Sequence, residues 1–165
     1  MAAWKMPPPI KVYEALGAIG DDRVRAAGGS DAALVWDVVS SDGGKTYRVE
    51  ISADGREIGS NDNASYWQGY LGYPAIAVLI AGGRLRASAA ATRALAAIPW
   101  KELNRRFKND YARTTAEVAR IVGERGGDFA AIHGEAAAIL GAIAALGLER
   151  GARRRPPRES GARRV

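Results

Sequence analysis

The chain contains no cysteine and only one histidine, His133, among its 165 residues. Disulfide bonds, cysteine-ligated metal sites and histidine-rich metal sites are therefore excluded. A hard cation held by carboxylate and amide oxygens is the one metal chemistry that the composition leaves open. We expect no metal and no cofactor. The lack of cysteine is compatible with an origin in a thermophile.

Long hydrophobic runs are also missing. The longest strongly apolar stretch, 75–81, is far shorter than the roughly 20 residues that a membrane-spanning helix needs. The first ten residues lack the apolar segment of a secretion signal. We therefore predict a cytoplasmic protein with no membrane partner. Its length and its 47% hydrophobic content suit one ordinary core, or a small domain packed on a helical one.

The net charge of +6 is concentrated in the C-terminal tail. Residues 150–165 hold seven arginines and one glutamate, which leaves the first 149 residues with 17 basic and 17 acidic side chains. We predict that 149–165 is a disordered tail with salt-sensitive, sequence-independent affinity for RNA or DNA. The alternative is a solubilising tail that binds only incidentally. The candidate residues are Arg150, Arg153, Arg154, Arg155, Arg158, Arg163 and Arg164.

The first hundred residues favour an extended lead over 1–9, which holds three prolines, and an α+β domain over 10–98. Apolar spacing predicts a short helix from Ile10 to Ile19, followed by a loop around Gly28. An antiparallel β-meander comes next, with an Asp-Gly turn at 54–55. The predicted strands are 33–40, 46–52 and 56–59.

The rest of the chain favours helices. Pro74 opens a short one that ends before Gly82, and an alanine-rich one covers 92–98. A stripe over 100–122 and a heptad seam over 129–146 predict a helical hairpin in 99–148, packed on the same core. Asp128 is the expected N-cap of the second helix of this hairpin. The predicted fold is thus α+β: a small antiparallel β-meander with short flanking helices, packed on a C-terminal helical hairpin.

The loop over 60–73 is both polar and aromatic. It suggests a ligand or partner site, a hard-ion loop, or a catalytic Asp62. The alternative is structural, because Asn, Asp and Ser satisfy nearby backbone groups and the rings can cover the core of the sheet. The candidate residues are Asn61, Asp62, Asn63, Tyr66, Trp67, Tyr70 and Tyr73.

Two further groups of residues have mainly structural interpretations. His133 has no nearby nucleophile or paired carboxylate, which favours a surface or helix-interface position over general-base chemistry. A basic helical face is interleaved with acidic residues, which favours a solvated, ion-paired face over phosphate contact. Its members are Lys101, Arg105, Arg106, Lys108 and Arg113. We find no glycine-rich phosphate loop and no nucleophile elbow.

Alternating Tyr and aliphatic residues at 47–51, the segment YPAIAVL at 73–79, and Gly83 with Leu85 follow a recognisable order. With these residues, 47–85 resembles the SWIM-type zinc finger family. That family has a β-hairpin, a Cys-x-Cys pair, a variable loop, and a Cys-x-His pair that opens a helix. Its members are associated with DNA or protein binding, which is what the resemblance implies.

The metal ligands of that family are absent from this chain. Ala75 and Ala77 stand where Cys and His belong, and 59–62 offers no thiol for the first pair. Zinc is therefore not expected. The resemblance implies instead that Ala75, Ala77, Trp67 and Tyr70 pack together in place of the ion.

Taken together, these patterns predict a non-enzymatic binding module. Its partner is nucleic acid, bound through the arginine tail, or another protein. One alternative is self-association as a homodimer through the alanine-rich hairpin, with Ile139 in its seam. A last alternative is an enzyme that uses Asp62 in an aromatic pocket.

Overall fold

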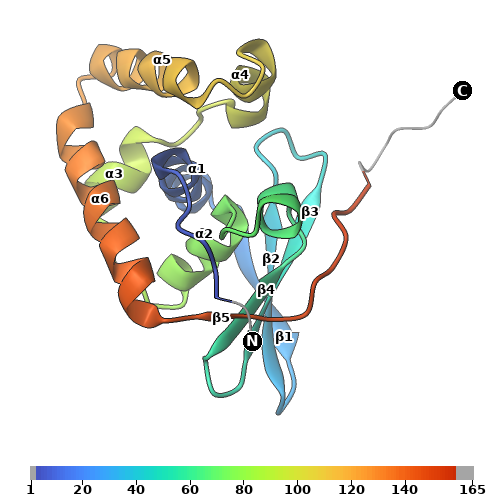
Figure 1. Cartoon of the computed structure of the whole chain (residues 1–165). Coiled ribbons are helices and arrows are strands. Elements are labelled where there is room, and N and C mark those ends of the chain that lie inside the picture. The colour runs from blue at the N-terminus through green and yellow to red at the C-terminus, as the bar shows by residue number, and fades with distance from the viewer. Residues whose placement is uncertain (1–2, 159–165) are drawn as a thin grey trace, which may run out of the picture.

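A five-stranded sheet lies on one side of the molecule and most helices lie on the other (Figure 1). The computed structural model describes residues 3–158. It confirms the predicted α+β class. In chain order the elements are α1 (Pro9–Gly20), β1 (Val24–Gly29), β2 (Ala33–Val39), β3 (Thr46–Ser52), β4 (Glu57–Ser60), the π-helical turn η1 (Ala64–Gln68), α2 (Tyr73–Ala81), α3 (Ala89–Ala94), α4 (Trp100–Arg106), α5 (Tyr111–Glu124), α6 (Phe129–Leu146) and β5 (Glu149–Arg150).

The strands follow one another across the sheet in the order β1-β2-β3-β4-β5. The first four pair antiparallel, which confirms the meander predicted for β2 to β4, and β5 adds in parallel beside β4. In β3 the side chains of Tyr47, Val49 and Ile51 are buried while Arg48 is exposed, as period-2 alternation requires. Gly55 adopts a φ of 73° in the turn before β4, which a side chain would disfavour.

Strand β1 was not predicted. Its sequence, VRAAGG, has low β-propensity, and the last five of its six residues are exposed. The strand exists because its backbone pairs with β2 at the edge of the sheet, with an irregularity between Ala26 and Gly29. The loop expected around Gly28 therefore begins only at Ser30.

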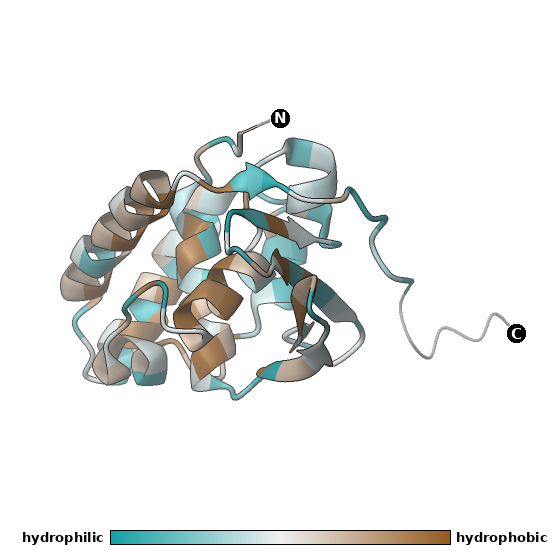
Figure 2. Ribbon diagram, turned by 90° about the horizontal axis from the view of Figure 1, so that it is seen from below, coloured by the Kyte–Doolittle hydropathy of each residue, from teal (hydrophilic) through white to brown (hydrophobic). Residues whose placement is uncertain are grey.

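Helix α1 lies at the centre of the molecule. Every residue from Ile10 to Ala18 is buried. Helix α2 lies between α1 and the sheet, and α3 and α6 cover other sides of α1. A Cβ at Gly17 would lie 2.7 Å from Nε1 of Trp100, and one at Gly20 would lie 2.0 Å from the carbonyl oxygen of Thr92. These glycines let α3 and α4 approach closely. Figure 2 shows strongly hydrophobic residues in the helices of the interior.

Two helices in the second half differ from their predicted extents. Helix α3 ends at Ala94, four residues earlier than expected, and Ala97 adopts a φ of 57°. The stripe predicted as one helix over 100–122 is divided into α4 and α5. Lys108 and Asn109 both have positive φ, and this left-handed turn redirects the chain.

Helix α6 keeps its predicted N-cap and its predicted seam. Asp128 accepts a hydrogen bond from the backbone N–H of Ala131, and four residues of the seam are buried. The seam packs on α1, where the rings of Tyr13 and Phe129 lie 5.1 Å apart. Helices α5 and α6 point in different directions and meet near the loop that joins them, so they do not pair along their lengths (Figure 1). The buried residues are Ile132, Ala136, Ile139 and Ile143.

The outward side of α6 carries mainly alanine and glycine. By length and composition α6 would suffice to cross a membrane, with a mean hydropathy of 1.7, and it is the one such helix among residues 3–158. That is weak evidence, because a core helix of a soluble protein passes the same test. Since the seam with Ile139 is already buried against the body, self-association through α6 would have to use the alanine side.

The N-terminal lead lies beside Glu149, at the start of the C-terminal tail. Within residues 3–8 it forms isolated bridges from Ala3 to Glu149 and from Lys5 to Tyr70, and α1 begins at Pro9, the last residue of the predicted lead. The tail was predicted to be disordered from residue 149, and for its first two residues this prediction is wrong. Glu149–Arg150 forms β5, because the backbone N–H of Glu149 and that of Gly151 donate to carbonyl oxygens at β4. Arg163 and Arg164 lie outside the described residues.

The packing of the α6 seam against the body can be tested through protein stability. We expect Ile139→Ala to lower the free energy of unfolding by about 2–4 kcal/mol, because it leaves a cavity against the core. Leu140→Ala, at the half-buried next position, should cost less than half as much. Urea unfolding of both variants measures the difference, and equal losses would argue against this packing.

Candidate functional site

A buried carboxylate ties the start of the polar loop together. Asp62 is only 5% exposed. Its Oδ1 accepts hydrogen bonds from Oγ of Ser60 at 2.5 Å and Oγ of Ser65 at 2.7 Å, and its Oδ2 accepts one from the N–H of Ser65 at 3.1 Å. A Cβ at Gly72 would lie 1.8 Å from Oδ2, so only glycine fits beside this carboxylate. The geometry therefore supports the structural interpretation of Asp62.

The two asparagines beside Asp62 differ in role. The Oδ1 atom of Asn61 accepts a hydrogen bond from the N–H of Arg48 at 2.8 Å, which continues the ladder beyond β4. Asn63 is exposed at the start of η1. Within residues 3–158 no group of three or more Asp, Glu or His side chains is placed to hold a metal ion.

The four rings of the loop do not form one cluster. Tyr70 and Tyr73 are half-buried, and the Tyr73 ring meets Tyr47 edge-on at 6.1 Å. Tyr66 meets Trp67 edge-on at 4.6 Å, and Trp67 is 66% exposed. The loop thus presents one large ring to solvent and leaves the other three partly buried.

The SWIM resemblance implied that Trp67 and Tyr70 pack with Ala75 and Ala77 in place of a metal ion. For Trp67 this is wrong, since most of its surface meets water. Ala75 and Ala77 are fully buried in α2, and Tyr70 is half-buried. At 60–65, near the expected position of the first ligand pair of the zinc finger, hydrogen bonds from Ser60 and Ser65 to Asp62 hold the loop.

The arginine tail folds back onto the aromatic loop. The guanidinium of Arg153 lies 4.3 Å from the ring centroid of Tyr66 and donates to the Tyr66 carbonyl oxygen at 3.0 Å. Arg150 lies over the ring of Trp4 at 5.0 Å, and Arg154 contacts the carboxylate of Glu50 at 3.4 Å. Three of the predicted arginines are therefore engaged with the body. Arg155 and Arg158 are exposed.

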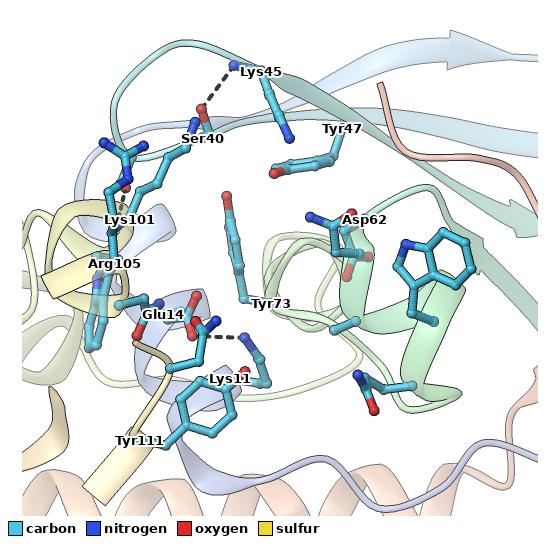
Figure 3. A pocket seen from close by; sticks show the side chains of 18 of the residues that line it. Lys11, Glu14, Ser40, Lys45, Tyr47, Asp62, Tyr73, Lys101, Arg105 and Tyr111 are labelled. Atoms are coloured by element: carbon cyan, nitrogen blue, oxygen red, sulfur yellow. Dashed lines mark hydrogen bonds and ion pairs between the residues drawn. The ribbon is translucent and has the colours of Figure 1, made fainter. Parts of the chain in front are cut away.

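A polar cavity of about 550 Å³ opens beside the polar loop, with Asp62 and Trp67 of that loop among its lining residues; Figure 3 shows the cavity. Its walls come from α1, the β2–β3 loop, the polar loop, α4 and the start of α5. Lys11 pairs with Glu14, Arg23 with Asp21 and Lys101 with Asp42, so Lys45 and Arg105 supply most of the positive charge of the cavity. The lining holds five basic and two acidic side chains. These residues are Lys11, Arg23, Lys45, Lys101 and Arg105, with Glu14 and Asp62.

An ion pair within α1 forms part of the cavity wall. Nζ of Lys11 lies 3.1 Å from Oε1 of Glu14, and both residues are buried. Burial, the largest single influence, would lower the pKa of Lys11, but the charge and hydrogen bond of Glu14 together with Tyr111 and Tyr70 outweigh it, and the pKa is raised. Sequence reasoning missed this pair. The available signal was a Lys and a Glu three residues apart inside an otherwise apolar helix.

Two tyrosine hydroxyls point into the same part of the cavity (Figure 3). Burial is the main cause that raises the pKa of Tyr47 and of Tyr73 above the ordinary value of 10.0. Both phenols therefore stay protonated near neutral pH. They can donate hydrogen bonds to an acceptor in the cavity.

The predicted basic helical face is divided by the break between α4 and α5. Lys101 and Arg105 line the cavity, whereas Arg106 pairs with Glu102 at 2.9 Å in solvent. The Arg113 guanidinium lies 5.0 Å from the ring centroid of Phe107, and Lys108 occupies the turn. His133 lies at a helix interface, where its Nδ1 and the hydroxyl of Tyr13 are hydrogen-bonded at 2.8 Å.

The hydrogen bonds to Asp62 predict its mutational effect. Asp62→Asn replaces an acceptor oxygen with an amide donor that faces other donors. We expect the free energy of unfolding to fall by about 2–4 kcal/mol. Asp31→Asn, at an exposed position, should change it little. Urea unfolding checks both, and an unchanged stability of Asp62→Asn would restore the case for a functional carboxylate.

Asp42, at the cavity rim, predicts a pH effect. The N–H of Gly44 at 2.9 Å, then Lys101 at 3.0 Å and Ser40 at 2.8 Å, hold the pKa of Asp42 well below its usual 3.8. A lowered folded-state pKa contributes stability above pH 3.8, and that contribution is lost as the pH falls further.

We expect Asp42→Asn to lower the stability by about 1 kcal/mol at pH 7, a small value because solvent screens this half-exposed group. The difference from wild type should shrink below pH 4. Urea unfolding between pH 7 and pH 3 measures it, and a difference that does not depend on pH would contradict this role of the charge.

Comparison with known proteins gives one match. No curated protein and no solved structure matches the chain. Residues 4–149 match the family described as Uncharacterised conserved protein UCP014422, a span that holds every residue lining the polar cavity and leaves the arginine tail outside. Because the match covers well over half of the sequence, the protein belongs to the family of uncharacterised conserved proteins UCP014422.

Proposed function

We propose that the protein is a non-enzymatic module that binds single-stranded nucleic acid without sequence preference. The observation that carries the proposal is the meeting of two distant segments. The exposed ring of Trp67 and the tail residues Arg150 and Arg153 border the same notch on the surface. Proteins that bind single strands combine these two features, an aromatic ring for bases and positive charge for phosphates.

The two features act through different forces. A base can stack on the Trp67 indole because two thirds of that side chain is already in water. Arg155 and Arg158, which follow the docked part of the tail, are exposed and can reach phosphates. Phosphate contacts release counterions and make affinity depend on salt, while stacking contributes affinity with little dependence on salt.

Resemblance to the SWIM-type finger supports the same proposal, since fingers of that family are associated with DNA or protein binding. The polar loop lies between the β3–β4 hairpin and α2, in the order that the resemblance requires. We propose a degenerate finger of this type, without metal, as the scaffold of the binding surface.

The proposal is tested with a fluorescently labelled random 20-nucleotide single strand, full-length protein and anisotropy over a salt series. Arg155→Gln with Arg158→Gln should reduce the slope of log affinity against log salt by up to about 1.4, because each lost phosphate contact removes about 0.7. Trp67→Ala should weaken binding about tenfold at fixed salt and leave the slope nearly unchanged.

Matched controls separate these effects from a general change of charge or surface. Arg86→Gln with Arg93→Gln removes two exposed arginines in and just before α3, which lies far from the tail (Figure 1). Leu34→Ala removes another exposed apolar side chain, 54% exposed. Neither should alter affinity or slope. If the wild type fails to bind the strand, or if tail and control variants behave alike, the proposal is wrong.

A further inference from the structure

The lining of the polar cavity indicates the kind of ligand that it binds, because it combines basic, hydrogen-bonding and aromatic side chains. Its volume of about 550 Å³ lies within the range of small-molecule sites. It is bordered by Trp67, so it adjoins the notch beside the tail without being part of it.

Three basic side chains line one part of the cavity. Lys45 comes from the β2–β3 loop, and Lys101 and Arg105 lie one turn apart on α4. Lys101 is held by Asp42 at 3.0 Å. The side chains of Lys45 and Arg105 form no ion pair among residues 3–158. Such a cluster fits a phosphate group, and Arg suits its oxygens especially well.

Hydrogen-bonding groups complete the lining. The Oδ1 atom of Asn104 is buried and has no hydrogen-bond partner within the described residues, so it lacks a donor. The hydroxyls of Tyr47 and Tyr73 can donate or accept. Both oxygens of Asp62 already accept hydrogen bonds within the loop. A fitting ligand therefore has N–H or O–H donors in addition to an anionic group.

Aromatic rings border the cavity. Trp67 is largely exposed at its edge, and Tyr111, from the start of α5, is half-buried with Nζ of Lys11 5.0 Å from its ring centroid. An exposed indole beside a positively charged cavity is suited to a planar base. An anion with hydroxyl groups alone, such as a sugar phosphate, would leave this ring unused.

We propose that the cavity binds a nucleoside phosphate. The phosphate lies among Lys45, Lys101 and Arg105, and the base lies against Trp67, with its donors toward Asn104. The same unit is present as a free nucleotide and as the phosphorylated end of a strand. Both proposals place a base on Trp67, but this inference does not depend on the arginine tail, because a mononucleotide has no strand for the tail to contact.

The test is calorimetry of full-length protein with four probes: AMP, adenosine, ribose 5-phosphate and inorganic phosphate. We expect AMP to bind at least tenfold more tightly than each of the other three. Arg105→Gln should weaken AMP about tenfold and leave adenosine unchanged. Trp67→Ala should weaken AMP and leave inorganic phosphate unchanged. Arg106→Gln, the neighbouring residue that pairs with Glu102, is the matched control and should bind AMP like wild type.

Several results would overturn the inference. They are no binding of AMP, AMP no tighter than inorganic phosphate or ribose 5-phosphate, or equal losses in the Arg105 and Arg106 variants. A second experiment separates the two sources of the ligand, a free nucleotide and the phosphorylated end of a strand. It measures the affinity of wild type and of Arg105→Gln for 10-nucleotide strands with and without a 5′-phosphate. If the 5′-phosphate increases the affinity of wild type but not of Arg105→Gln, the ligand is the end of a strand. Tight AMP binding without such a gain identifies a free nucleotide.

Discussion

Helix α1 is buried from Ile10 to Ala18, and the arrangement of the other helices depends on this constraint. A helix that is apolar on nearly every side must be covered on nearly every side. Helix α2 and the sheet cover one side, and α3 and α6 cover others. The one charged pair on α1, Lys11 with Glu14, is tolerable because each partner offsets the cost of burying the other. The same pair forms part of the cavity wall, so the core and the candidate site share this helix.

Local signals predicted the elements that local chemistry determines. The alternation in β3, the Asp-Gly turn, the proline at the start of α2 and the N-cap Asp128 each concern a few adjacent residues, and the structure confirms all four. The errors arose where distant contacts decide. Edge strand β1 forms through backbone pairing despite its alanines and glycines, and the α6 seam packs on α1 rather than on its neighbour α5.

The candidate site was less predictable than the fold. The aromatic loop and the tail were each recognised from composition, but nothing in the sequence shows that Arg153 lies on Tyr66, since 87 residues separate them. The cavity was invisible for the same reason, because its lining extends from Lys11 to Tyr111. Asp62 had the strongest local signal, and that signal was structural: serine hydroxyls and a backbone N–H surround its carboxylate.

The distribution of charge argues for anionic ligands more strongly than the net charge does. The first 149 residues are neutral overall, yet five basic and two acidic side chains line one cavity within them. Three of the five basic side chains are paired with carboxylates, and placing Lys45 and Arg105 at the same cavity costs free energy that a bound anion would offset. The tail adds further basic side chains, Arg150 and Arg153, at the notch that Trp67 also lines. A base stacked on that ring would therefore lie between basic groups of the body and of the tail on the protein's own surface, so that the phosphates of a strand would be attracted to both.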